Sequence, residues 1–280
     1  MADALGKLCI GLEANTFMYT DKSASLKSKF KRQIQGRSSV LLIHESIRNL
    51  PQCDELLFPF VDSQVVVFPS ITFSAFQPDI QYAFVNGVVV KNGLGGEWNS
   101  RIVLWAYLNG LTPTETEFLF CEEVFDALGY FDEWEKSTES LRASFEICGL
   151  DYGRWVRAVQ RTGVFMYGIN HPMQIGLSQL TLQIAEKVFP HLVRESMDLE
   201  KITKDRLSKI VWPVYPEVGS CLGVEGSYHW QSARKDADLA EFIRLCFATW
   251  DEYQLKNKIF NLIPLLTVEE SQQMKRFVGA

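Results

Sequence analysis

Several features that would settle the class of a protein at once are missing from this sequence. No apolar run approaches the roughly 18 residues that cross a bilayer, so no membrane span is predicted. The N-terminal segment has no basic start followed by a long apolar stretch, so no signal peptide is expected. None of the six cysteines has a C-x-x-C partner and the four histidines are scattered, so no metal site is predicted. Such cysteines are typical of reduced thiols in a cytoplasmic protein.

Positive charge is also scarce overall. The 28 Lys and Arg residues against 34 Asp and Glu give a net charge of −6, which argues against a nucleic-acid partner. With 47% hydrophobic residues in 280, the chain can bury a substantial core. Basic residues gather near the N-terminus, in "KSASLKSKFKRQIQGR" at 22–37, which includes Lys29, Lys31 and Arg32. This segment is either a solvated helix face or a seat for a phosphate-bearing ligand.

Hydrophobic patterning predicts an α/β fold. Residues 1–110 are expected to hold a parallel or mixed sheet, and residues 111–280 to be mainly helical, as two domains or as one integrated domain. Two apolar runs joined by Asn86–Gly87 predict a hairpin. Strands are expected over 7–14, 38–46, 63–70, in the hairpin 83–96, and at 164–167, which could return to the sheet. Helices are expected over 26–35, 99–110, 112–129, 131–149, 151–163, 174–189, 239–250 and after Thr267.

Local signals add detail to this pattern. The helix at 112–129 has the clearest start, because Thr112 is followed by Pro113 and, three residues after the cap, by Glu115. The helix at 99–110 is expected to be capped by its first residue, an asparagine. The segment 211–230, with two prolines and three glycines, predicts a long functional loop. "NGLGG" at 92–96 follows the hairpin and is not G-x-G-x-x-G, so no dinucleotide fingerprint is assigned there.

A histidine stands at an unusual place in "RTGVFMYGINHPMQ", residues 161–174. Asn170, His171 and Pro172 follow a short apolar run and precede a predicted helix. An imidazole titrates near neutral pH, so His171 is a candidate general base. Pro172 disfavours helical backbone at His171 itself. The alternative is that Asn170 and His171 cap the following helix and satisfy its amides.

Two further segments carry polar side chains beside predicted elements. "FPSITFSAFQPDIQYAF" at 68–84 follows a strand and contains Asp79, which either forms a turn or cap or faces a ligand at a strand end. Asp79 could orient His171 as a carboxylate partner. Ser100 and Arg101 occupy the first turn of the helix at 99–110. That position is either an anion seat or a capped helix start with a solvated arginine.

The order of these segments is that of a known family. "FPSITFSAFQPDIQYAF", "EWNSRIVLWAYLNGLT", "FCEEVFDALGYFDEWEKSTESL", "DYGRWVRAVQRTGVFMYGINHP" and "WPVYPEVGSCLGVEGSYHW" together resemble the WcbI-type polysaccharide biosynthesis family. The resemblance covers about residues 65–250, and its weight lies in order and spacing rather than in a single motif.

The resemblance implies a protein that binds coenzyme A or acetyl-CoA and acetylates sugars of capsular or surface polysaccharides. His171 would be the base, and Asn170 and Asp79 would support the site. The basic segment around Lys27 to Arg32 would receive the phosphates of the coenzyme. Phosphate or sugar would also be held by Arg161, Ser100 and Arg101.

One departure from the family bears on mechanism. The family opens with a strand leading to Asn-Cys-Gln, whereas this chain has "EANTF", with Thr16 at the position of the reactive thiol. Threonine is a much weaker nucleophile than a thiol, so direct transfer with His171 as base is one hypothesis. A hydrolase of glycan esters or phosphoesters is another. The third is a non-catalytic carbohydrate- or nucleotide-binding protein, which His171 bonded on both nitrogens would favour. The oligomeric state is left open.

Overall fold

The computed structural model describes residues 40–48, 64–85, 87–191, 193, 201, 204–256 and 266–278. It has the predicted mixed α/β character, with strands early in the described chain and mostly helices later. The chain forms two compact units, each assembled from separated segments. Unit 1 comprises Met1–Ile71, Glu139–Thr162 and Gln174–Asp205, and unit 2 comprises Thr72–Thr138, Gly163–Met173 and Arg206–Ala280. The boundary near residue 110 stays a prediction.

A parallel strand pair opens the described part of unit 1. β1 (Val40–His44) and β2 (Gln64–Phe68) pair residue for residue, as their β-branched composition predicts. α3 (Glu45–Arg48) follows β1 directly. Beyond β2, the Ser70 amide donates to Glu45 Oε2 at 3.2 Å and to Ser144 Oγ at 3.0 Å. These bonds tie both strand ends to a helix that is distant in sequence.

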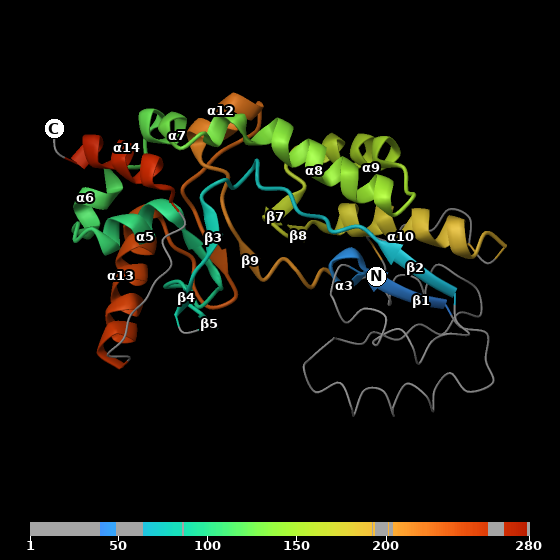
Figure 1. The fold of residues 1–280 in the computed structure, drawn as a ribbon, viewed down its shortest axis with the longest axis horizontal. Helices are drawn as coiled ribbons and strands as arrows, with labels where there is room; N and C mark the ends of the chain where they lie inside the picture. Colours follow the sequence, from blue (N-terminus) through green and yellow to red (C-terminus); the bar gives the residue numbers. More distant parts are fainter. Residues whose placement is uncertain are drawn as a thin grey trace. The chain divides into compact units, whose positions relative to one another are not determined.

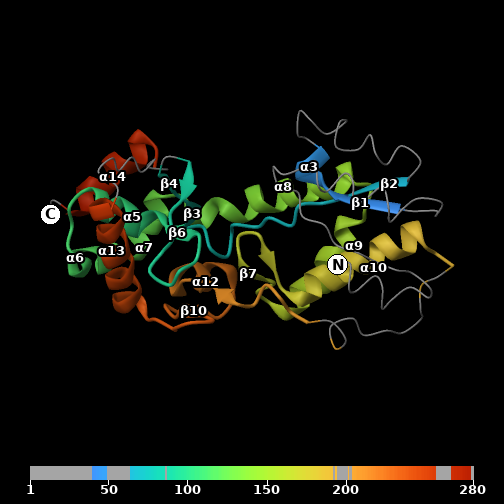
Figure 2. The same ribbon diagram turned by 90° about the horizontal axis from the view of Figure 1, so that it is seen from below.

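Helices complete unit 1. Asp151 caps α9 (Tyr152–Val159), and its carboxylate accepts from the Arg154 amide at 2.8 Å. α9 packs against α10 (Gln174–Val188), as Figure 2 shows, and Trp155 Nε1 donates to the Gly176 carbonyl at 2.8 Å. The remaining elements are η3 (Gln160–Thr162) and the later turns of α8 (Glu133–Ile147), whose first turns belong to unit 2.

Unit 2 is organised around a two-stranded antiparallel ladder. β3 (Ile80–Tyr82) pairs with β6 (Trp98–Ser100), so that the first residue of each strand lies opposite the last residue of the other. The predicted hairpin lies between them in sequence, as β4 (Phe84–Val85) and β5 (Val88–Val89). Its Gly87 has a φ of +77°, which a glycine adopts without strain. β6 leads straight into α5 (Arg101–Leu108).

The segment predicted as one helix over 112–129 forms two. α6 (Pro113–Glu117) begins with the predicted capping box between Thr112 and Glu115, and α7 (Glu122–Ala127) follows a break. Leu119 and Phe120 are both buried in that break, at 2% and 8% exposed. The chain leaves the helical path between Glu117 and Glu122, and both side chains enter the core from this break. Phe118, which the helical spacing over 112–129 places on the same face as Phe125, is 78% exposed.

The predicted long loop at 211–230 is wrong. β9 (Ile210–Val211) precedes it, and the segment itself contains α12 (Pro216–Leu222), with proline at the first turn and Gly223 in left-handed geometry after the last. Three of its aromatic residues are core: Trp212, Tyr215 and Trp230 are buried. Burial of these large apolar side chains brings the backbone of the segment into the interior. Its N–H and C=O groups must then form hydrogen bonds within the protein.

Two long helices close unit 2. α13 (Leu239–Lys256) buries the predicted face, including Phe242 and Trp250 at 0% exposed. Trp230 stacks on Phe242, with ring centroids 4.3 Å apart. Figure 1 shows α13 beside α5 and α6, and α14 (Val268–Val278) beside α7. The other elements of this unit are η2 (Tyr130–Asp132), β7 (Met166–Gly168), β8 (His171–Pro172) and β10 (Gln231–Ser232).

Three findings concern membrane spans, metal ligands and cysteines within the described residues. No described helix has the length and hydrophobicity that crossing a membrane requires. Within the same ranges, no group of three or more His, Cys, Asp or Glu side chains could hold a metal. The described cysteines are free thiols, Cys148 and Cys246 being buried.

Candidate active site

The predicted histidine lies on a small hairpin and not at a helix start. β7 pairs with β8 in antiparallel fashion, and Gly168 lies opposite His171. Among the described residues this strand pairs with the next strand along the chain, and the suggested return to the sheet stays a prediction. α10 begins at Gln174. Asn170 and His171 thus occupy the turn and the strand, and they do not cap the helix.

The imidazole of His171 is half-buried and incompletely bonded. Its ring lies 4.4 Å from the Trp98 ring, measured between centroids. Burial lowers the pKa of His171 below 6.5, and a weaker opposing effect comes from a hydrogen bond with the backbone of Leu207. Nδ1 is buried and has no hydrogen-bond partner among the described residues. The ring is therefore neutral at pH 7.

The bond with Leu207 also decides which nitrogen is free. It raises the pKa of His171, so it favours the protonated ring, which means that the ring donates to the Leu207 carbonyl. Because Nδ1 has no partner, we assign the donor to Nε2. The neutral ring then carries its proton on Nε2 and a lone pair on Nδ1, as a general base requires. A ligand must displace the atoms that cover Nδ1 to use that lone pair.

Two neighbouring elements hold the Trp98 ring against His171. A Cβ atom placed on Gly168 would lie 2.2 Å from Cη2 of Trp98, so only glycine leaves room for the indole. On the ladder, Trp98 lies directly opposite Tyr82, and its Nε1 donates to the Tyr82 hydroxyl oxygen at 3.1 Å. Asn170 Nδ2 donates to the same oxygen at 2.9 Å. Tyr82, Trp98, Asn170 and His171, called the His171 cluster below, therefore form one connected group.

Asp79 occupies the opposite end of the ladder and serves different partners. It is 0% exposed. Its Oδ1 accepts from the Tyr130 hydroxyl at 2.8 Å and from the Ile102 amide at 3.1 Å, and its Oδ2 accepts from the Tyr215 hydroxyl at 2.7 Å. Burial raises the pKa of Asp79, while the hydrogen bonds, including one with Ser100, oppose that rise. The hydrogen bonds of the described residues give no support to the predicted pairing of Asp79 with His171.

Ser100 and Arg101 are also engaged within the protein. Ser100 is buried and caps α5, accepting from the Val103 amide at 3.0 Å, so the cap lies one residue later than the sequence predicts. Arg101 forms an ion pair with Glu270 at 2.8 Å. The first amides of α5 face the carbonyl and carboxyl oxygens of Asp79. At this helix start the chain's own Asp79 takes the place that the sequence suggested for an anion.

Five further predicted site residues lie outside the described residues or outside unit 2. Thr16, Lys29, Lys31 and Arg32 lie outside the described residues. Arg161 lies in η3 of unit 1 with its side chain exposed. Their roles stay predictions.

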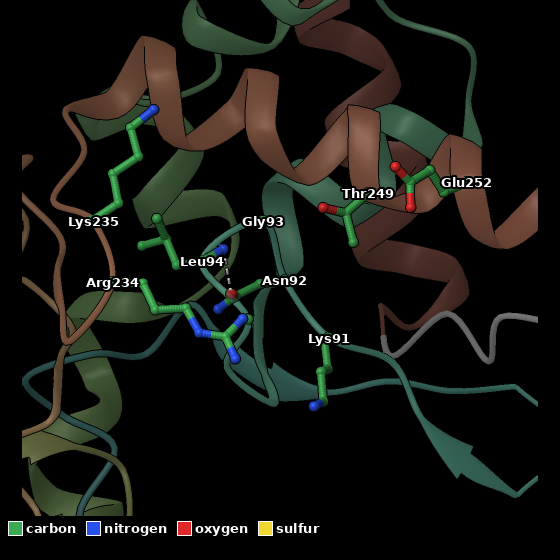
Figure 3. A pocket seen from close by; sticks show the side chains of 9 residues that line it. Lys91, Asn92, Gly93, Leu94, Arg234, Lys235, Thr249 and Glu252 are labelled. Carbon is green, nitrogen blue, oxygen red and sulfur yellow. Dashed lines mark hydrogen bonds between the residues drawn. The ribbon is translucent and has the colours of Figure 1, made fainter.

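A pocket of about 390 Å³ lies beside the glycine-rich loop at residues 92–96, as Figure 3 shows. The loop is folded onto Asn92, whose Oδ1 accepts from the amides of Leu94 at 2.8 Å and Gly96 at 3.0 Å. The Gly95 amide donates to the Asn92 carbonyl at 3.0 Å. These amides are not directed at a ligand, and the loop leads into a strand. The loop therefore does not have the geometry of a dinucleotide fingerprint, in which the glycine loop opens a helix.

Sequence reasoning missed Tyr82 and Trp98, two of the four residues of the His171 cluster. Trp98 was expected in the core, where it does lie at 4% exposed, but it also contacts the imidazole. Tyr82 was one polar residue among several, and Leu207 carried no signal. The approach of Trp98 to His171 depends on the notch at Gly168, which lies in another segment of the chain. Only the pairing of β3 with β6 could have brought Tyr82 and Trp98 together, and 15 residues separate them in sequence.

Fold and site together define a mixed α/β protein with a neutral histidine in a cluster of aromatic and amide side chains. A family model described as polysaccharide biosynthesis enzyme WcbI matches residues 44–190, more than half of the chain. The chain therefore belongs to the WcbI family of polysaccharide biosynthesis enzymes.

A solved structure supports the same fold. It is a native WcbI protein, described as a novel polysaccharide biosynthesis enzyme without a disulfide bond between coenzyme A and one of its cysteines. The two structures align with a TM-score of 0.59 at 11% sequence identity, over 94% of this chain and 88% of the other. No curated protein sequence matches the chain.

Proposed function

We propose that this chain is a coenzyme A-binding O-acetyltransferase that acts on a sugar hydroxyl in capsular or surface polysaccharide biosynthesis. The observation that carries the proposal is the state of His171, a neutral imidazole with one nitrogen bonded and the other unpartnered. Membership of a family of polysaccharide biosynthesis enzymes supports the acceptor class. The coenzyme A named for a solved family member supports the donor class.

His171 has the role of general base in this proposal. Nδ1 removes the proton of the acceptor hydroxyl as the hydroxyl oxygen attacks the thioester carbonyl carbon. Leu207 holds the other ring nitrogen and so sets the tautomer, a function that a carboxylate performs in many enzymes. No role in proton transfer is required of Asp79.

Transfer is direct, without an acyl-enzyme. The position expected for the family's reactive thiol carries Thr16, and a threonine hydroxyl is a poor nucleophile near neutral pH. A base that activates the acceptor hydroxyl makes a protein nucleophile unnecessary. The basic residues Lys29, Lys31 and Arg32 are proposed to receive the coenzyme phosphates, and Arg161 is proposed to assist.

A thermal-shift titration tests coenzyme binding. A ligand that binds only the folded protein stabilises it by about 2.7 kcal/mol at 100 times its Kd, so coenzyme A should raise the melting temperature in a concentration-dependent way. A flat response at millimolar coenzyme A contradicts the proposal. Replacement of Lys29, Lys31 and Arg32 by Gln should weaken the shift.

Substitution of the histidine tests the chemistry. His171→Ala should lower the acetyl-transfer rate on the order of 10³-fold and leave the thermal shift with coenzyme A. His229→Ala is the matched control, because His229 is exposed and its Nε2 lies 3.7 Å from a carboxylate oxygen of Asp236. Equal activity of the two variants would remove His171 from the mechanism.

The two alternatives predict different assay results. A hydrolase would cleave a sugar acetate or phosphoester without coenzyme A. A purely binding protein would show neither reaction. Its structural criterion, an imidazole bonded on both nitrogens, is not met by His171, whose Nδ1 has no partner among the described residues.

A further inference from the structure

The hydroxyl group of Tyr82 is held from two sides. Trp98 Nε1 donates to its oxygen at 3.1 Å across the ladder, and Asn170 Nδ2 donates at 2.9 Å from the β7–β8 turn. A phenolic oxygen accepts about two hydrogen bonds. Both acceptor positions are therefore occupied, and the orientation of the hydroxyl is set by two different elements.

The hydrogen atom of this hydroxyl is not used within the described part of the chain. Both printed bonds of Tyr82 are bonds that its oxygen accepts. An O–H group whose oxygen accepts two bonds is polarised and becomes a better donor. Tyr82 is half-buried and Asn170 is exposed, so a ligand can approach this hydroxyl from solvent.

The hydroxyl also lies next to the proposed base. Asn170 is the chain neighbour of His171, and the Trp98 ring that donates to Tyr82 contacts the imidazole with centroids 4.4 Å apart. The notch at Gly168 keeps that indole in place. A lone pair on His171 Nδ1 and a free donor on Tyr82 are therefore held in one cluster, which is the arrangement that acyl transfer needs.

Given the proposed acetyltransferase function, on which this inference rests, we propose that Tyr82 donates to the carbonyl oxygen of the acyl thioester. As His171 takes the proton of the acceptor hydroxyl, a carbon–oxygen bond forms and the carbonyl π electrons move to oxygen, where the Tyr82 O–H stabilises them. The carbon–sulfur bond then breaks, and the imidazolium returns its proton to the thiolate. The products are the sugar ester and coenzyme A.

Tyr82→Phe tests this role because it removes only the hydroxyl. Loss of one donor to an oxyanion lowers kcat about 100-fold, while the KM for acetyl-CoA and the thermal shift with coenzyme A should stay near wild type. Tyr107→Phe is the matched control, since its hydroxyl bonds Asp251 at 3.0 Å on the surface. Tyr107→Phe should keep the wild-type kcat.

Asn170→Asp tests the direction of the hydrogen bond. A carboxylate can only accept hydrogen bonds, so the new side chain would accept one from the Tyr82 hydroxyl. That hydroxyl would then no longer be free to donate to a ligand. A loss of kcat similar to that of Tyr82→Phe supports the proposal, and the double variant should lose no more than Tyr82→Phe alone. Wild-type activity of Asn170→Asp would show that the Tyr82 hydroxyl already donates to Asn170, which overturns the proposal.

The remaining outcomes separate the two levels of inference. If wild-type protein transfers acetyl groups and Tyr82→Phe keeps its kcat, the role of Tyr82 is wrong and the proposed function stands. If Tyr82→Phe melts well below wild type and KM rises with kcat unchanged, Tyr82 is structural. If wild-type protein neither binds coenzyme A nor transfers acetyl groups, the proposed function fails, and the role of Tyr82 fails with it.

Discussion

The two ends of the β3–β6 ladder are built from similar residue types and differ in hydrogen bonding. At one end, Asp79 is fully buried and accepts from two tyrosine hydroxyls and one helix amide. At the other end, the Tyr82 hydroxyl has a free hydrogen atom and His171 has a free lone pair among the described residues. Asp79, which directly precedes β3, and Tyr82, the last residue of β3, are three positions apart in sequence and thus belong to a saturated site and to an unsaturated one.

The difference separates polar groups that stabilise the fold from polar groups that can bind a ligand. A buried group with all its partners supplied by the chain has no capacity left for a substrate. A buried acceptor without a partner costs about 1–3 kcal/mol, and a ligand hydroxyl would satisfy it. The polar loop at 68–84, which the sequence suggests is one site, therefore contributes to both.

The Asp79 end of the ladder should be the most sensitive to truncation of a side chain. Asp79→Ala leaves the hydroxyls of Tyr130 and Tyr215 buried without an acceptor, and should lower the free energy of unfolding by about 3–5 kcal/mol. Chemical denaturation measures this loss. The control is Asp251→Ala, which removes the exposed bond to Tyr107 and should cost less than about 1 kcal/mol. Similar losses for the two variants would refute the structural role of Asp79.

A single added methyl group should disrupt the His171 cluster at the other end of the ladder. In Gly168→Ala the new Cβ would lie 2.2 Å from the Trp98 ring, so the indole must move away from Tyr82 and His171. Overpacking of this kind costs about 1–3 kcal/mol, and acetyl transfer should fall with it. Gly153→Ala in α9 is the control, because a Cβ there would meet only side-chain atoms at 3.3 Å. Unchanged activity of Gly168→Ala would mean that the Trp98 contact is dispensable.

A fall in pH should lower the activity by protonating His171. Burial lowers the pKa of His171 below 6.5, so the base stays unprotonated at pH values where a free imidazole is charged. The acidic limb of kcat/KM should therefore fall below pH 6.5. The unfolded chain binds this proton more readily, so the contribution of His171 to stability is full above pH 6.5 and is lost as pH falls from 6.5 through the lower pKa of the folded protein. A limb centred above pH 6.5 would contradict the assignment.

The smallest effect is expected for the ion pair between Arg101 and Glu270, beside the Asp79 end of the ladder. Arg101→Gln breaks the bond to Glu270, and a double-mutant cycle with Glu270→Gln should give a coupling of about 1 kcal/mol or less, because both side chains are partly exposed. The thermal shift with coenzyme A should not change. Loss of that shift would show that Arg101 holds a phosphate of the coenzyme, as the family resemblance implies.

Local patterns predicted the elements of the fold where the relevant forces act over a few residues. The β-branched runs of β1 and β2, the paired strands of the hairpin, the capping box at Thr112 and the apolar face of α13 are all present. The pattern failed at Phe118 and over 211–230. There the burial of neighbouring aromatic side chains, which depends on the whole core, overrode periodicity and turn composition.

The sequence by itself determined the fold class, the family and the choice of His171 as the residue to examine. Only the tertiary structure decided what each polar group does. It bonds Asp79 to Tyr130 and Tyr215, and it places Tyr82 and Trp98 beside His171. The physical reason is that a hydrogen bond saturates a group only through partners brought close by folding, and these partners come from segments 16 to 136 residues apart.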